Sequence, residues 1–375
     1  MSLAGMTSDL KDRLRRWRDR LISDPRFQRW SLGNPLTRAI ARRRSRAMLD
    51  LCAGFVYSQT LFACVRLKLF DILKDGPLSI EALSQKLELS ADATRRLLDA
   101  SSSISLTERR GAGRYGLGQL GAALIGNAPA LALIEHQPML YADLADPVAL
   151  LRGSRRTKLA GYWPYSAAER PSELGGEQVG AYSALMAASQ PMVAEEALAV
   201  YPIERHCRLM DVGGGEGVFL AHAAGKAPAL ELALFDLPAV AERARARLTE
   251  AGLMTRTQIH GGNFLKDPLP MGADVISLVR IVHDHDDASA LELLRNVRQA
   301  LPQGGTLLIV EAISDQKNVE PLDAYYGFYT LAMGRGEPRT FEEISSLLLA
   351  AGFVRPKLLG ARLPVVASVI VATAG

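Results

Sequence analysis

The sequence is poor in cysteine and in long apolar runs. Its three cysteines, Cys52, Cys64 and Cys207, are an odd number without a short C-x-x-C spacing, which argues against a disulfide framework and a cysteine-rich zinc site. No apolar stretch reaches the roughly 18 residues that a membrane-spanning helix needs, and no apolar segment follows the N-terminal charges as in a secretory signal. Low-complexity segments and internal repeats are also absent. These absences predict a cytoplasmic protein.

Basic residues are concentrated at the N-terminus. Residues 1–50 hold 13 Lys and Arg against 5 Asp and Glu, which leaves 31 basic against 35 acidic residues elsewhere. Leu14, Trp17 and Leu21 recur at helical spacing between arginines, and such a basic amphipathic helix can lie on an anionic membrane surface. A solvated arm, or one that packs on a partner subunit, fits the same pattern. We treat residues 1–50 as a basic amphipathic arm.

The next segment, residues 51–170, has the pattern of a winged helix. Ser79 and Ser90 can each cap a helix, and LTERRGAGRYGL reads as two short strands around a turn with glycine. Winged helices often bind DNA, but here Arg95 and Arg96 of the second helix are offset by nearby aspartates. A structural or dimerising role is therefore favoured, and no nucleic-acid partner is expected.

Residues 171–375 alternate between strands and helices, which predicts a parallel α/β sheet covered by helices on both faces. Apolar runs occur at 208–212, 230–236, 258–262, 273–282 and 304–313. The last two runs, FVRPKLLGA and PVVASVIVATA, are joined by only a few residues. Because parallel strands need a long crossover connection, the last strand should enter the sheet antiparallel.

A glycine-rich turn follows the first of these strands. Asp211 opens a D-x-G-x-G-x-G motif that contains Gly213 and Gly215, while the nicotinamide pattern G-x-G-x-x-G fails because Val218 stands at its last position. Glycines at a strand end let the backbone approach a ligand, and Asp236 ends the second strand, where an acid can accept hydrogen bonds from a ribose. The turn, the acid and the terminal antiparallel hairpin together indicate a nucleoside-containing cofactor.

These features resemble the class I S-adenosylmethionine-dependent small-molecule O-methyltransferases, and within them the bacterial enzymes that methylate hydroxylated carotenoids. MDVGGGEG, ALFDLP, HGGNF, RIVHDHDD and LLIVEAI carry the resemblance, which covers most of the chain. It implies a Rossmann-like methyltransferase sheet, an N-terminal winged-helix dimerisation domain, a homodimer, and S-adenosylmethionine as cofactor with no metal. It also implies cofactor contacts at Asp211, Gly213, Gly215, Asp236, Leu237, Asn263, Phe264 and Arg280. Asn263 departs from the family's usual Asp, and Arg280 from its frequent Lys.

The cluster His283-Asp284-His285-Asp286-Asp287 has three possible roles: a metal site, the cap of the helix that follows, or proton transfer. The remaining histidines have no spacing that would complete a metal site. Methylation of a hydroxyl needs a base for the departing proton, and histidine suits this task at neutral pH. The resemblance implies that His283 is this base, followed by Asp284, with His285 in place of the family's Trp. It implies Glu311 as an orienting acid, and Glu337 as a displaced candidate for the second.

The acceptor is the least defined part of this reading. Several aromatic and methionine residues lie in segments that line the acceptor pocket in the family, although such residues at helical spacing are more often plain core: Tyr182, Met186, Met192, Tyr325, Phe328, Tyr329 and Met333. The resemblance implies a hydrophobic hydroxyl acceptor, an acyclic hydroxylated carotenoid, so the arm could attach the enzyme to the cytoplasmic face of a membrane. The alternatives are a phenolic or polyketide acceptor, or a winged-helix regulator that senses a ligand.

Overall fold

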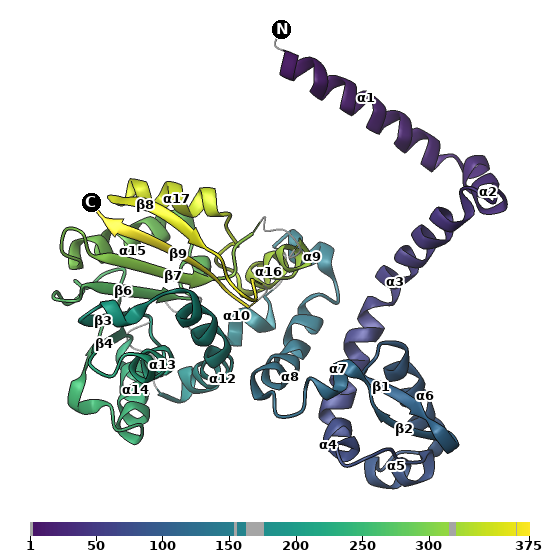
Figure 1. Cartoon of the computed structure of the whole chain (residues 1–375), viewed down its shortest axis with the longest axis horizontal. Coiled ribbons are helices and arrows are strands. Elements are labelled where there is room, and N and C mark those ends of the chain that lie inside the picture. The colour runs from purple at the N-terminus through teal and green to yellow at the C-terminus, as the bar shows by residue number, and fades with distance from the viewer. Residues whose placement is uncertain (1–2, 154–155, 163–175, 315–319, 365) are drawn as a thin grey trace. The chain divides into compact units, whose positions relative to one another are not determined.

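A computed structural model describes residues 3–153, 156–162, 176–314, 320–364 and 366–375. The chain forms two compact units, Met1–Ile125 and Gly126–Gly375 (Figure 1). The three-part division at residues 50 and 170 stays a prediction. Helices α8 (Ala128–Asp143) and α10 (Lys158–Tyr162), which it groups with the winged helix, pack against α12 (Gly176–Val200) and α16 (Glu320–Met333) of the second unit.

The first unit begins with three helices, α1 (Leu3–Ser23), α2 (Pro25–Gly33) and α3 (Arg38–Arg66), and the basic arm ends within α3 at residue 50. The short helix α4 (Leu69–Leu73) follows. Asp24 caps α2, because its carboxylate accepts a hydrogen bond from the Arg26 amide. By length and composition α3 is apolar enough to cross a membrane, and 17% of its most apolar 18-residue stretch is buried. The expectation that no stretch reaches this length was therefore wrong, because five of the seven charged residues of α3 lie at its start, in residues 38–46, and the rest of the helix is largely apolar.

The winged-helix pattern is present in the first unit as predicted. Ser79 and Ser90 cap α5 (Ile80–Leu87) and α6 (Ala91–Ser103), each accepting a hydrogen bond from the third amide of its helix. Strands β1 (Thr107–Arg110) and β2 (Arg114–Leu117) pair antiparallel around the turn η1 (Gly111–Gly113), and α7 (Gln119–Ala122) follows.

The second unit is built on a seven-stranded sheet in the order β5-β4-β3-β6-β7-β9-β8. Its strands are β3 (Arg208–Val212), β4 (Glu231–Asp236), β5 (Thr257–Gly261), β6 (Val275–Val279), β7 (Thr306–Glu311), β8 (Phe353–Leu359) and β9 (Ser368–Ala374). β9 lies between β7 and β8 and runs antiparallel to both, while all other pairs are parallel. The antiparallel insertion of the last strand is confirmed.

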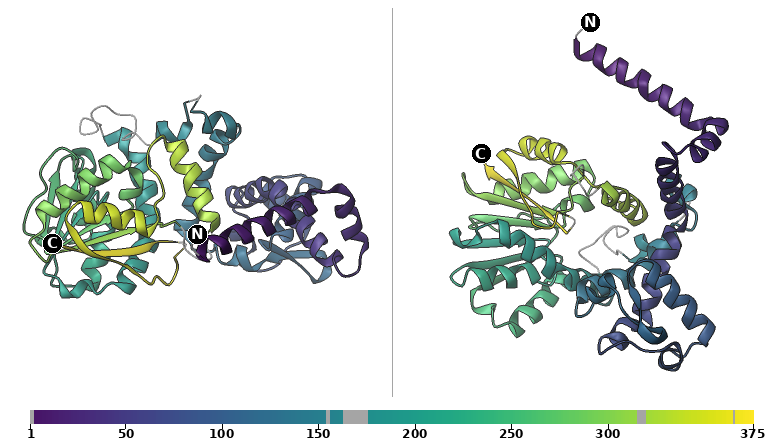
Figure 2. Two further views of the ribbon diagram at one scale, coloured as in Figure 1. Left: turned by 90° about the horizontal axis from the view of Figure 1, so that it is seen from above. Right: turned by 45° about the vertical axis from the view of Figure 1, so that its right-hand side comes forward.

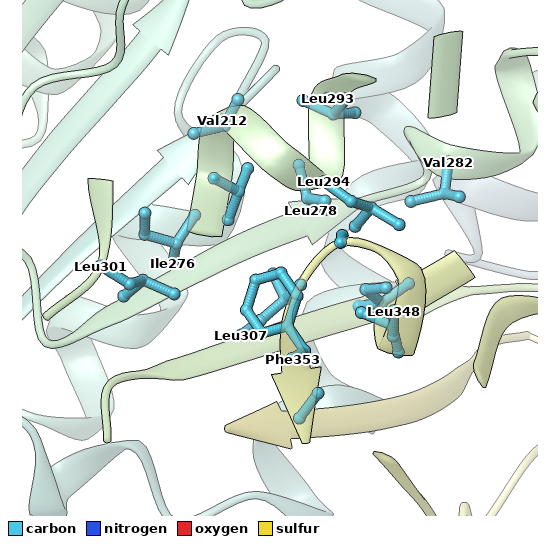
Figure 3. Packing of buried hydrophobic residues seen from close by; sticks show 14 of the residues in the cluster. Val212, Ile276, Leu278, Val282, Leu293, Leu294, Leu301, Leu307, Leu348 and Phe353 are labelled. Atoms are coloured by element: carbon cyan, nitrogen blue, oxygen red, sulfur yellow. The ribbon is translucent and has the colours of Figure 1, made fainter. Parts of the chain in front are cut away.

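Helices cover both faces of this sheet, as Figures 1 and 2 show. α12, α13 (Val218–Lys226) and α14 (Pro238–Glu250) pack on one face, and α15 (Asp287–Ala300) and α17 (Phe341–Ala350) on the other. The remaining elements of the unit are α9 (Pro147–Leu151) and the short turns η3 (Ile203–Arg205), η4 (Met254–Arg256) and η5 (Val282–Asp284). In Figure 3, Leu293 and Leu294 of α15 and Leu348 of α17 pack over Leu278 and Leu307 of the sheet. This apolar packing holds the ends of β3, β4, β6 and β7, from which the candidate site is built.

Candidate active site

The glycine turn between β3 and α13 has backbone angles that favour glycine. Gly213 has a φ of +70°, and a Cβ there would lie 2.4 Å from Ile281 Cδ1. Gly215 has a φ of +57°, but a Cβ there would have no heavy atom within 4 Å. Both glycines line the cavity at this end of the sheet. The turn therefore exposes backbone to a ligand in a conformation that other residues adopt only with strain.

Two buried acids support the turn in different ways. Asp236, at the end of β4, lines the cavity and accepts hydrogen bonds from the amides of Gly215 at 2.8 Å and Leu237 at 2.7 Å. Burial raises its pKa to about 6 even though both amides lower it. Asp211 lies behind the turn, where its Oδ1 accepts from the Ser277 hydroxyl at 2.6 Å. Burial raises the pKa of Asp211 to about 7.

Asp211 is thus the one predicted cofactor contact that is absent from the cavity wall within the described part of the chain. The side chain is fully buried, and its Oδ2 has no hydrogen-bond partner among the described residues. A Cβ at Gly214 would lie 2.8 Å from that oxygen. Asp211 therefore connects β3 to Ser277 of β6 and lies beneath the turn.

A second wall of the cavity comes from the loop after β5. Asn263 and Phe264 of this loop line the cavity beside Leu237, which follows β4. Asn263 Oδ1 accepts from the Leu265 amide at 3.0 Å, so this side chain shapes its own loop. Phe264 meets His285 edge to face, with ring centroids 5.5 Å apart. His285 also lines the cavity, and burial lowers its pKa, so that the ring is neutral at pH 7.

Arg280 joins the sheet to α12 at the edge of the cavity. Its φ of +58° ends β6 earlier than the apolar run to residue 282 predicted. The guanidinium donates to the Ser189 hydroxyl at 2.8 Å and to the Met186 carbonyl at 3.2 Å. The Arg280 side chain therefore holds α12, which supplies one side of the cavity.

His283 lies in the turn η5 between two carboxylates. Its Nδ1 is 3.3 Å from Glu311 Oε2, and its Nε2 is 3.3 Å from Asp284 Oδ1. Glu311, which is 1% exposed, also accepts the backbone amide of His283 at 3.2 Å. Burial lowers the pKa of His283, but the two carboxylates outweigh it and raise the pKa to about 10. As arranged here, the ring is an imidazolium at neutral pH.

Glu337 does not take the place of the second acid. Its carboxylate is 3.3 Å from the Arg339 guanidinium, which also contacts Asp287 at 2.9 Å, while only its backbone amide contacts His283, donating to the carbonyl at 2.9 Å. The Glu337 side chain is 57% exposed. Asp284, the sequence neighbour of the histidine, provides the second carboxylate. Asp286 caps α15 by accepting from the Ser289 amide at 2.9 Å, so the helix-cap prediction also holds for this cluster.

The cavity includes residues that the sequence analysis did not assign to it. Ser183 and Gln190 of α12 line it, as do His285 and Arg335. Of these four residues, only His285 was noted in the sequence, because it stands where the family has Trp. Of the suggested acceptor residues, Tyr182 and Met186 line the cavity, and Tyr182 also packs against an apolar cluster with Leu140, Leu150 and Leu159. Four others belong to that cluster and do not line the cavity: Tyr325, Phe328, Tyr329 and Met333. Met192 belongs to neither group.

The residues at this end of the sheet fit S-adenosylmethionine. The turn presents backbone at Gly213 and Gly215, and Asp236 offers a carboxylate beside the cavity for a ribose. Phe264, Leu237 and His285 supply apolar and aromatic surface for a purine. Within the described ranges, no three His, Cys, Asp or Glu side chains converge as metal ligands.

Comparison with known proteins defines the family. Residues 141–354 match the O-methyltransferase domain, and residues 49–127 match the O-methyltransferase dimerisation domain. The chain belongs to this family of S-adenosylmethionine-dependent O-methyltransferases, which decides between the enzyme and the ligand-sensing regulator in favour of the enzyme. The dimerisation domain supports a homodimer.

Two relatives and one solved structure show which O-methyltransferases the chain is similar to. The chain is 42% identical over 358 residues to demethylspheroidene O-methyltransferase of Cereibacter sphaeroides, covering 94% of this chain and 93% of that protein. Its identity to the enzyme of the same name from Rhodobacter capsulatus is 39%, over 91% of this chain and 85% of that protein. Among solved structures, the S-adenosylhomocysteine-bound CalO1, a methyltransferase in calicheamicin biosynthesis, aligns with a TM-score of 0.72 and 26% identity, over 89% of this chain and 98% of that one.

Proposed function

We propose that this enzyme methylates the hydroxyl group of an acyclic hydroxylated carotenoid of the demethylspheroidene type. The observation that carries the proposal is the 42% identity, over 94% of the chain, to an enzyme named for that acceptor. The resemblance read from the sequence points the same way. The products would be a methoxy carotenoid and S-adenosylhomocysteine.

The cofactor would be held by the turn and the two loops beside it. Gly213 and Gly215 would contact its amino-acid portion, Asp236 its ribose, and Asn263 with Phe264 its adenine. When bound, S-adenosylmethionine supplies an electrophilic methyl group on a sulfonium centre. Arg280 contributes indirectly, because its hydrogen bonds fix α12 against the end of β6.

His283 would accept the proton that the acceptor hydroxyl loses as its oxygen forms the new bond to carbon. Glu311 orients the ring through Nδ1 and through the backbone amide, which leaves Nε2 as the atom that exchanges protons. Nε2 faces Asp284 at 3.3 Å, so the ring must release this proton before it can act as a base.

We further infer that the enzyme is a cytoplasmic homodimer that meets its acceptor at the membrane, with no nucleic-acid partner. A carotenoid dissolves in the bilayer, and the acceptor must pass from lipid into the protein. The dimerisation domain and the basic arm both lie in the first unit, separate from the residues that carry the chemistry.

Transfer of labelled methyl groups to alternative acceptors tests this proposal. The enzyme is incubated with labelled S-adenosylmethionine and either demethylspheroidene or a catechol, each in detergent. Transfer to the carotenoid alone supports the proposal. Transfer to the catechol alone would support the mechanism but indicate a phenolic acceptor. Transfer to neither acceptor, while the cofactor still binds, would reject both acceptors.

A further inference from the structure

Helices α1 and α2 lie outside the domains that define the family. The dimerisation domain match begins at residue 49, so the arm before it is additional to that domain. Within the first unit, α1 contacts α2 and α2 contacts α3. The proposed chemistry uses none of these residues, and the arm is the most basic part of the chain.

α1 carries an exposed apolar stripe. Leu10, Leu14 and Trp17 are separated by four and three residues, which places them on one face of a helix. Their exposed fractions are 59%, 59% and 65%. Trp30 of α2 is 54% exposed, and its ring centroid lies 5.5 Å from that of Phe27. Large apolar side chains that are exposed along one face of a helix indicate a surface that binds a protein or a membrane.

The charged residues of α1 are distributed unevenly around this apolar stripe. At about 100° per residue, four cations fall on its two flanks, and both acids of the central turns fall on the opposite face. The flanking cations are Arg13 and Arg20 on one side, and Lys11 and Arg18 on the other, where the Arg18 guanidinium also contacts the Asp19 carboxylate at 2.6 Å. The opposite face carries Asp12 and Asp19, with Arg15 and Arg16 beside them.

We propose that α1 and α2 bind the surface of an anionic lipid bilayer, with the apolar stripe in the headgroup region and the flanking cations on lipid phosphates. Tryptophan prefers this interface, and arginine binds phosphate by paired hydrogen bonds. Charge decides against a second copy of the arm as the partner, since residues 1–50 carry 13 basic and 5 acidic residues and two such arms would repel each other. The binding itself does not depend on the proposed acceptor.

The test is flotation of the full-length dimer with lipid vesicles, without acceptor. The protein should bind vesicles of phosphatidylglycerol with phosphatidylcholine, and far less to phosphatidylcholine alone, with binding reduced by salt. Arg13→Gln with Arg20→Gln should weaken binding about 30-fold, at about fivefold per flanking cation. Arg15→Gln with Arg16→Gln removes the same charge from the opposite face and should weaken it far less.

A second pair of variants separates lipid from protein partners. Leu14→Gln with Trp17→Gln should abolish flotation, while methyl transfer to an acceptor in detergent stays unchanged. No binding of the wild type to anionic vesicles, or an equal loss in both arginine pairs, would overturn the proposal. A change in oligomeric state of Leu14→Gln with Trp17→Gln in the absence of vesicles would assign the stripe to a second copy and overturn it too. Because flotation needs no acceptor, its failure is distinct from failure of the proposed function.

Discussion

Replacing Asp284 by asparagine should shift the pH dependence of methyl transfer. In the wild type, burial lowers the pKa of His283 and two carboxylates at equal distances of 3.3 Å raise it, with a result of about 10 instead of about 6.5. This difference corresponds to about 5 kcal/mol in favour of the charged ring, at about 1.4 kcal/mol per pKa unit. Asp284→Asn removes one of these two attractions while burial remains.

The pKa of His283 should therefore fall by at least about 2 in this variant. A base works only when deprotonated, so the kcat/KM of the wild type should rise with pH towards about 10, and that of the variant should reach its plateau at lower pH. The assay is initial rate against pH with saturating S-adenosylmethionine.

Asp286→Asn is the matched control for this experiment. It makes the same chemical change two residues away, at the exposed cap of α15. Asparagine also caps helices well, so the variant should keep both its stability and the wild-type pH profile. If the profile of Asp284→Asn coincides with that of the wild type, His283 is not the group whose titration limits the reaction.

Three further predictions concern the turn and the acids around it. Gly213→Ala places a Cβ 2.4 Å from Ile281 Cδ1 at a φ of +70°, so it should lower the free energy of unfolding by about 1 to 3 kcal/mol and abolish binding of S-adenosylhomocysteine in calorimetry. Gly215→Ala introduces only the backbone strain of a φ of +57°, so it should lose cofactor affinity with a smaller loss of stability. Equal unfolding midpoints for Gly213→Ala and the wild type would contradict the packing described for Gly213. The pKa of Asp211 is raised from 3.8 to about 7, so the folded state binds this proton more tightly than the unfolded chain, and stability of the ligand-free enzyme should fall by up to about 4 kcal/mol between pH 4 and 7. In Asp211→Asn, thermal unfolding should show a weaker fall over this range, and an unchanged pH dependence would mean that Asp211 is not the group responsible.

Much of the fold follows from local patterns in the sequence. Ser79 and Ser90 mark helix starts because a hydroxyl before an apolar-periodic segment satisfies free amides. The short connection before β9 requires an antiparallel strand whatever the rest of the sheet does. These features depend on residues within a few positions of one another, which is why they can be read without coordinates.

The details of the site depend on contacts between distant residues. The Glu337 carboxylate lies beside Arg339, whose guanidinium also reaches Asp287 and the Val282 carbonyl in a distant segment, and the sequence does not record that placement. Likewise, Asp211 belongs to the glycine motif but points into the protein towards Ser277 of a neighbouring strand. The aromatic residues of α16 fit both a pocket and a core by spacing, and packing with α8 and α10 places them in a core.

The central claim is that His283 removes the acceptor proton while other residues hold the cofactor. The most direct measurement compares His283→Ala with the wild type for binding of labelled S-adenosylmethionine and for a single turnover on demethylspheroidene. The account predicts unchanged cofactor affinity and a rate lower by about 10² to 10⁴. An unchanged rate would show that alignment of the two substrates alone drives the reaction, and would contradict the role assigned to His283.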